Sequence, residues 1–188
     1  MKPFLQMLTL LIAASLTAPV FADEYTDAVA KFKQSPVTQP FFDKAYGYAI
    51  FPTIGKGGVA VGGAYGKGRV YKKGGIYTGD VSMTQLSVGF QLGGQTFSQL
   101  IFFENQEAYD KFTQGNFEFS AGASAVAIAV GAGAQAGSTG AQANVDKAQM
   151  ETRYIDGMAV FSMQKGGLMY EAALAGQKFK FTPAGEKH

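Results

Sequence analysis

The chain has 188 residues, with 25 glycines and 25 Phe or Tyr residues, no Cys and no Trp, and its only His is the last residue, His188. The lack of Cys excludes disulfides, thiolate nucleophiles and Cys-ligated zinc, and a terminal His is a poor general base. With 47% hydrophobic and 16% charged residues, the composition is that of a globular protein long enough to form one domain.

Residues 1–22 have the pattern of a secretory signal peptide. Lys2 provides a positive start, residues 4–16 are a mainly apolar run of 13, and Val20 and Ala22 fit the minus-three and minus-one positions of a cleavage site. A membrane anchor is the alternative, but 13 residues are too few to cross about 30 Å of hydrocarbon as a helix. We therefore expect cleavage after Ala22 and a periplasmic or secreted product.

Two short helices are expected next. In residues 23–37, an apolar stripe at i, i+3, i+4 and i+7 predicts an amphipathic helix that ends at Pro36 and docks either on the core or on a membrane; the stripe is Tyr25, Ala28, Val29 and Phe32. Pro40 opens a second helical stretch that ends near Gly47. Residues 48–51 then read as a short apolar strand that stops before Pro52.

Residues 59–73 alternate with period two, which predicts a strand with two very different faces. One face carries Val59, Val61, Tyr65, Lys67, Arg69, Tyr71 and Lys73, and the other carries only Ala60, Gly62, Ala64, Gly66 and Gly68. Gly74-Gly75 predicts a two-residue hairpin turn, and the chain should return over 76–92 with Thr84 and Leu86 on its more apolar face.

The remaining chain is expected to be mostly strands. A third strand is predicted over 96–103, followed by a short helix capped by Asn105 that carries Ala108, Tyr109 and Phe112. Residues 120–136 alternate Ala/Gly with β-branched residues, which favours a strand over an Ala-rich helix, and further strands should span 152–164 and 167–181. The predicted fold class is α+β, predominantly antiparallel β, with a barrel- or sandwich-like sheet and a few short helices.

The two small-residue faces imply that another part of the structure, or a ligand, approaches the backbone closely. The simpler explanation is close packing against a helix or sheet, and the alternative is a slot for a flat or linear apolar ligand such as an acyl chain.

Positive charge is concentrated early in the chain. Between Asp43 and Asp80 there is no acidic residue, and the window holds Lys44, Lys56, Lys67, Arg69, Lys72 and Lys73. Residues 80–171 have nine acidic and four basic residues, a net charge of −5. This asymmetry suggests an anionic partner, although lysines also protect solvated strand edges.

Familiar catalytic motifs are missing. Residues 55–60 match G-x-G-x-x-A, but no helical pattern follows, so a dinucleotide site lacks its context. A hydrolase in which Asp43, Asp80 or Glu118 meet as an acid/base pair is a less favoured alternative, as is a small outer-membrane β-barrel. Nucleic-acid binding is disfavoured by the expected export and by a pI of about 8.7. We expect no enzyme activity, cofactor or metal.

Several segments together resemble the SYLF domain. Residues 45–52 read A-Y-G-Y-A-I-F-P, followed by Gly57-Gly58 and by G-G-A-Y-G-K-G at 62–68, where the family has A-x-G-x-A-I-F-P and a glycine-rich G-x-G-x-G. The similarity continues through 93–95, 117–127 and 165–168, and so covers most of 38–181, leaving 182–188 as a polar tail. The family commonly has Trp after the first hairpin turn, where this chain has Ile76-Tyr77-Thr78.

The resemblance implies lipid binding, since SYLF domains bind phosphoinositides in eukaryotes and in some members actin filaments, while bacterial members are mostly exported. For an exported bacterial protein, actin is an unlikely partner, and an anionic envelope phospholipid is the expected ligand. The basic segment agrees with this expectation, because it presents cations and aromatic rings together. The candidate lipid-binding residues are Lys56, Tyr65, Lys67, Arg69, Tyr71, Lys72 and Lys73.

Overall fold

The computed structural model describes residues 23–59, 61–88, 95–119, 128–129, 154–165, 174 and 176–186. Its helices are α1 (Glu24–Lys33), α2 (Gln39–Lys44) and α3 (Gln106–Thr113). Its strands are β1 (Gly47–Val59), β2 (Val61–Lys72), β3 (Ile76–Val88), β4 (Gln95–Phe103), β5 (Asn116–Glu118), β6 (Ile128–Ala129), β7 (Met158–Lys165) and β8 (Gln177–Pro183).

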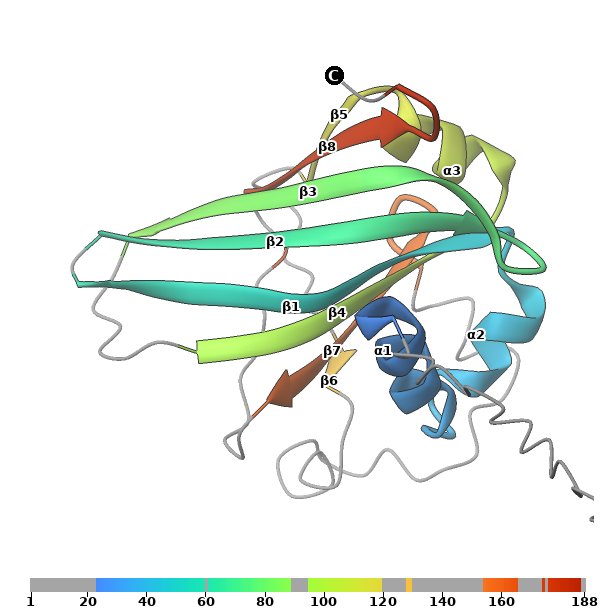
Figure 1. The fold of residues 1–188 in the computed structure, drawn as a ribbon, viewed down its shortest axis with the longest axis horizontal. Helices are drawn as coiled ribbons and strands as arrows, with labels where there is room; N and C mark the ends of the chain where they lie inside the picture. The colour runs from blue at the N-terminus through green and yellow to red at the C-terminus, as the bar shows by residue number, and fades with distance from the viewer. Residues whose placement is uncertain are drawn as a thin grey trace, which may run out of the picture.

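The strands form one eight-stranded sheet in the order β5-β8-β3-β2-β1-β4-β7-β6. Every pair is antiparallel except β6 with β7, and the sheet curls into a half-barrel (Figure 1). This confirms the predicted α+β class with a predominantly antiparallel sheet. Because β8 pairs with β3, the C-terminal strand lies beside the β2–β3 hairpin although about a hundred residues separate them in sequence.

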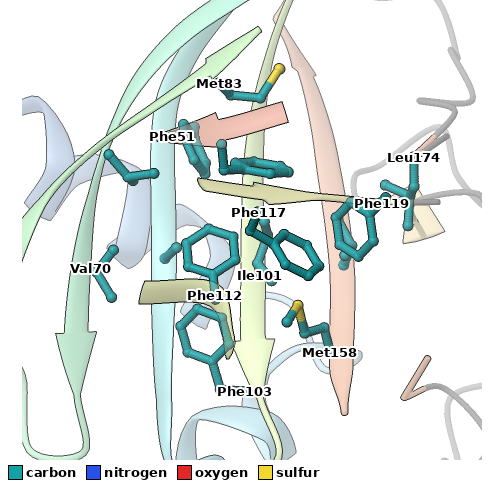
Figure 2. Packing of buried hydrophobic residues seen from close by; sticks show 14 of the residues in the cluster. Phe51, Val70, Met83, Ile101, Phe103, Phe112, Phe117, Phe119, Met158 and Leu174 are labelled. Atoms are coloured by element: carbon teal, nitrogen blue, oxygen red, sulfur yellow. The ribbon is translucent and has the colours of Figure 1, made fainter. Parts of the chain in front are cut away.

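Each face of the sheet buries its own apolar cluster. On the inner face, side chains from the strands pack with α3 into a core rich in Phe, which includes Phe51, Phe103, Phe112, Phe117 and Phe179 (Figure 2). On the outer face, Ala28 and Phe32 of α1 and Phe41 of α2 cover Leu100 and Phe161. Figure 1 shows both helices at one end of the long strands.

The N-terminal amphipathic helix therefore docks on the core, which was one of its two predicted destinations. Ala28 and Phe32 of the predicted stripe are buried, and Tyr25 and Val29 pack at the edge of the same cluster. The predicted cap of α3 is also confirmed, since the Asn105 side chain accepts a hydrogen bond of 3.0 Å from the Ala108 amide.

The predicted strand break at Pro52 is wrong. β1 runs on to Val59, and the register with both neighbouring strands shifts between Ile50 and Ile54. A proline has no amide hydrogen to donate to a ladder, and the irregularity accommodates it inside the strand. As a consequence Val59 belongs to β1 and pairs with Val61 at the start of β2, so the predicted strand over 59–73 begins two residues later.

Other boundaries and faces also differ from the prediction. Lys72 pairs with Ile76, which leaves three residues in the hairpin turn instead of two, and Gly74 and Gly75 both have the positive φ that favours glycine. In β3 the buried face carries Val81 and Met83, whereas Leu86 on the supposed apolar face is 84% exposed. Strands predicted over 152–164 and 167–181 are β7 and β8, which begin at Met158 and Gln177.

The small-residue face of β2 packs closely against its neighbouring strand. A Cβ at Gly68 would lie 2.7 Å from two ring atoms of Phe51, and one at Gly66 would lie 2.6 Å from Cγ1 of Ile54. Those side chains of β1 lie across the glycines and fill the space, which confirms the close-packing explanation at these positions. Of the second small-residue segment, 120–136, only β6 is among the described residues. The predicted signal peptide, residues 1–22, lies outside them.

Candidate functional site

The outer face of β2 carries the aromatic and basic side chains that the sequence placed there. Ala64, Gly66, Gly68 and Val70 are buried, while Tyr65 is 51% exposed and Lys67 is also exposed. Arg69 and Tyr71 lie on the same outer face but are only half-exposed. Four of the seven candidate residues therefore share one face of one strand.

Strand β8 adds two lysines to this surface. Lys178 and Lys180 are exposed and alternate with the inward-facing Phe179. Lys180 pairs with Ser82 of β3, which in turn pairs with Lys67 of β2, so the two lysines lie two strands apart, or about 10 Å, in one row across the sheet. Lys178 stands two residues further along β8 and contacts Glu118 at 3.4 Å.

Two exposed apolar side chains stand beside these lysines. Leu86 is opposite Gly63 and Tyr65 is opposite Thr84, so Leu86 and Tyr65 are diagonal neighbours on the outer face of β2 and β3. We call the five residues of this surface the basic face: Tyr65, Lys67, Leu86, Lys178 and Lys180. The alternation Lys-Phe-Lys-Phe at 178–181 is a signal that could have pointed to the two β8 lysines, but their place next to β3 requires the long-range pairing.

Arg69 is committed to internal contacts. Its guanidinium forms an ion pair with Asp23, lies 4.0 Å from the centre of the Tyr25 ring, and has its Nε 3.9 Å from Asp80. Burial disfavours the charged form, but hydrogen bonds to Tyr71 and Asp23 outweigh it and raise the pKa of Arg69. Arg69 therefore fastens the start of α1 to the outer face.

Tyr71 is part of an aromatic row. Its ring stacks on Tyr48 with centroids 5.1 Å apart and contacts Tyr77 at 5.9 Å. Burial, with a smaller contribution from Tyr71, raises the pKa of Tyr48 to about 12. Tyr77, near the position where the family commonly has Trp, belongs to this row and is partly exposed.

The other three candidate lysines lie apart from the basic face. Lys56 is two residues beyond the buried Ile54 on the inner face, and burial lowers the pKa of its ammonium. The Lys72 ammonium lies 5.0 Å from the centre of the Tyr109 ring of α3. Lys73 is in the hairpin turn, where it is exposed. The structure thus separates Lys56 and Lys72 from the outer-facing residues.

The three carboxylates considered for a hydrolase lie in different settings. Asp80 is beside Arg69 on β3, Glu118 is beside Lys178 on β5, and Asp43 is on α2. Asp80 pairs with Thr182 of β8, and Glu118 pairs with Lys178 of the same strand. Because these two partners are four residues apart, Asp80 and Glu118 are separated by about 13 Å along the strand direction.

The described part of the chain has neither a membrane-spanning helix nor a cluster of metal-binding side chains. In that part, no helix is both long and apolar enough to cross a membrane. The same residues contain no group of three or more His, Asp or Glu side chains placed to hold a metal ion.

Comparison with known proteins places the chain in a family. The family model described as Las17-binding protein actin regulator matches residues 84–184, which is more than half of the 188 residues and includes the β8 lysines but not β1 or β2. A curated relative, Beta cell expansion factor A from Aeromonas veronii, is 27% identical over 163 residues, which are 82% of this chain and 52% of the relative. The chain spans about half the length of that relative. The protein therefore belongs to the Las17-binding protein actin regulator family, whose SYLF domains are of the lipid- and actin-binding type.

Proposed function

We propose that this protein is a non-enzymatic binder of anionic phospholipid that attaches to membrane surfaces through its basic face. The observation that carries the proposal is the row formed by Lys67 and Lys180, which come from strands far apart in sequence and point to the same side of the sheet. Family membership supports a binding role, because the family is one of regulators and lipid- or actin-binding domains.

The expected strength follows from the residues of the basic face. Each Lys near an anionic surface contributes about 1 kcal/mol, so Lys67 and Lys180 together provide about 2 kcal/mol, while the charge of Lys178 is offset by Glu118. Partial insertion of Leu86 and Tyr65 into the headgroup region adds about 1.5–3 kcal/mol. The sum corresponds to reversible, peripheral binding that depends on anionic lipid and weakens as salt screens the lysines.

The experiment is vesicle co-sedimentation with a charge-reversal variant and a matched control. Lys67→Glu with Lys180→Glu changes the net charge by four units on the basic face, and Lys31→Glu with Lys111→Glu changes it equally on helices α1 and α3. Lys178 is left in place because it contacts Glu118. Each charge reversal removes attraction and adds repulsion. Lys67→Glu with Lys180→Glu should therefore lose ~4 kcal/mol of binding free energy, which is about a thousandfold in affinity for phosphatidylglycerol vesicles.

The control variant should bind nearly as well as wild type, with circular dichroism showing that both variants are folded. Equal losses in the two variants would mean that only net charge matters, and full binding by Lys67→Glu/Lys180→Glu would refute the proposal.

We also propose that the protein is exported to the periplasm or secreted, where it meets an anionic envelope lipid rather than actin. The support is the signal-peptide pattern of residues 1–22, with its positive start, apolar run and small residue at position 22. Intact-mass measurement on protein from its own cells should show a chain that begins at Asp23. A chain in the membrane fraction that retains Met1 would contradict export.

A further inference from the structure

A groove of about 490 Å³ lies beside the β2–β3 hairpin turn, at the end of the sheet covered by α1 and α2. Figure 1 shows α2 next to this turn. Three charged side chains line the groove, Lys33 from α1, Asp43 from α2 and Lys73 from the turn. Its volume lies within the range of sites that take small ligands.

The groove is separate from the basic face. Lys67 and Lys73 are six residues apart on β2 and its turn, which corresponds to about 20 Å along an extended strand. None of the ion pairs found among the described residues involves Lys33, Asp43 or Lys73. Two cations and one carboxylate therefore face the same space without being paired to each other.

The apolar wall of the groove is formed by aromatic rings that pack on one another. Phe42 packs edge-on against Phe102 with centroids 4.8 Å apart and against Tyr48 at 5.6 Å. The Lys33 ammonium lies 5.3 Å from the centre of the Phe42 ring, which holds this cation over the wall. Gly74 and Gly75 of the turn also line the groove; their positive φ values favour glycine, so neither residue adds a side chain there.

We infer that this groove binds one molecule of an amphiphilic phosphate ester that carries a primary ammonium group, as an ethanolamine phospholipid does. The phosphate oxygens bind between Lys33 and Lys73, where two ammonium groups can donate hydrogen bonds. The ligand's own ammonium donates to the Asp43 carboxylate. The first carbons of its chains lie on the Phe42 and Tyr48 rings. A choline headgroup has no N–H to donate to Asp43, and a glycerol headgroup has no positive charge, so both should bind less tightly.

The inference concerns a different site from the basic face, and its test uses soluble ligands so that surface attachment plays no part. The ¹⁵N-labelled protein is titrated with dihexanoyl phosphatidylethanolamine, with the phosphatidylglycerol and phosphatidylcholine forms of the same chain length, and with glycerophosphoethanolamine, which has no acyl chains. The ethanolamine lipid should shift the Gly74 and Gly75 amide signals and should bind about tenfold more tightly than the other two lipids, as one charge-assisted hydrogen bond predicts. Glycerophosphoethanolamine should bind less tightly than the lipid.

Variants assign the roles within the groove. Asp43→Asn should remove the preference for ethanolamine over glycerol headgroups, and Lys33→Gln with Lys73→Gln should weaken binding of all three lipids. Lys67→Glu with Lys180→Glu should leave these titrations unchanged even though it should weaken vesicle binding about a thousandfold, so the two proposals can fail separately. Shifts that occur away from the turn, or a headgroup preference that survives Asp43→Asn, would overturn the inference. Equal binding of glycerophosphoethanolamine and the lipid would overturn the role assigned to Phe42 and Tyr48.

Discussion

Replacing Gly68 by alanine should destabilise the protein, although alanine is usually the better residue in a strand. A Cβ at this position would lie 2.7 Å from Cδ1 and Cε1 of Phe51 and 2.8 Å from the Ile50 carbonyl oxygen. Ordinary contacts between carbon atoms are about 3.5–4.0 Å, so the neighbouring atoms must move. The ring has little freedom to do so, because Phe51 is fully buried and packs on Phe179 with centroids 5.7 Å apart.

The size of the effect is a balance between two terms. Overpacking a well-filled core costs about 1–3 kcal/mol, and replacing a strand glycine by alanine returns about 0.5–1 kcal/mol. At the middle of both ranges the net loss is about 1 kcal/mol, which for a chain of this size lowers the melting temperature by roughly 2–4 °C. Thermal denaturation followed by circular dichroism measures it.

Gly55→Ala in β1 is the matched control. Gly55 is exposed, and a Cβ there would meet no atom within 4 Å, so the substitution should leave the melting temperature unchanged or raise it slightly. If Gly68→Ala is as stable as wild type, or if both substitutions destabilise the protein equally, the close packing of β1 side chains over the β2 glycines is wrong.

Two further predictions concern the outer face and two half-buried tyrosines. Arg69→Gln should speed hydrogen exchange at the amides of the first turns of α1, because it removes the Asp23 ion pair and the contact with Tyr25. The same variant should leave vesicle binding nearly intact. Lost vesicle binding with unchanged hydrogen exchange would show that Arg69 is a lipid ligand instead. Burial raises the pKa of Tyr48 and Tyr154 to about 12, whereas in the unfolded chain both ionise near pH 10. The unfolded state therefore releases its tyrosine protons at lower pH than the folded state, so the urea midpoint of unfolding should fall as pH rises from 10 to 12. Tyr48→Phe should reduce that fall. A urea midpoint that does not change over this pH range would contradict the partial burial of these rings.

The local elements of the fold could be predicted because their signals lie within a few residues. The stripe from Tyr25 to Phe32 specifies α1, Asn105 caps α3, and the alternation along β2 separates the buried glycines from Tyr65 and Lys67. The break assigned to Pro52 failed because a proline that disrupts one ladder position can be accommodated by a register shift, and the strand continues beyond it.

The candidate site could be predicted only in part, because its composition depends on contacts between distant segments. Lys180 reaches Lys67 through the β8–β3–β2 pairing, and the sequence does not specify that β8 lies beside β3. Arg69 shares a strand face with Lys67, but Asp23, 46 residues earlier, holds it in an ion pair. Lys56 and Lys72 belong to the same positively charged segment, but their strand positions turn them away from that face.

The central claim is that the basic face is the surface that meets the membrane, and paramagnetic relaxation tests it most directly. The ¹⁵N-labelled protein is bound to phosphatidylglycerol nanodiscs that contain a headgroup spin label, and the loss of each amide signal is measured. Signals from Tyr65, Lys67, Leu86 and Lys180 should be broadened most, while those of α3, on the inner side of the sheet, should stay sharp. Strongest broadening at α3, or at α1 with the basic face unaffected, would contradict the claim.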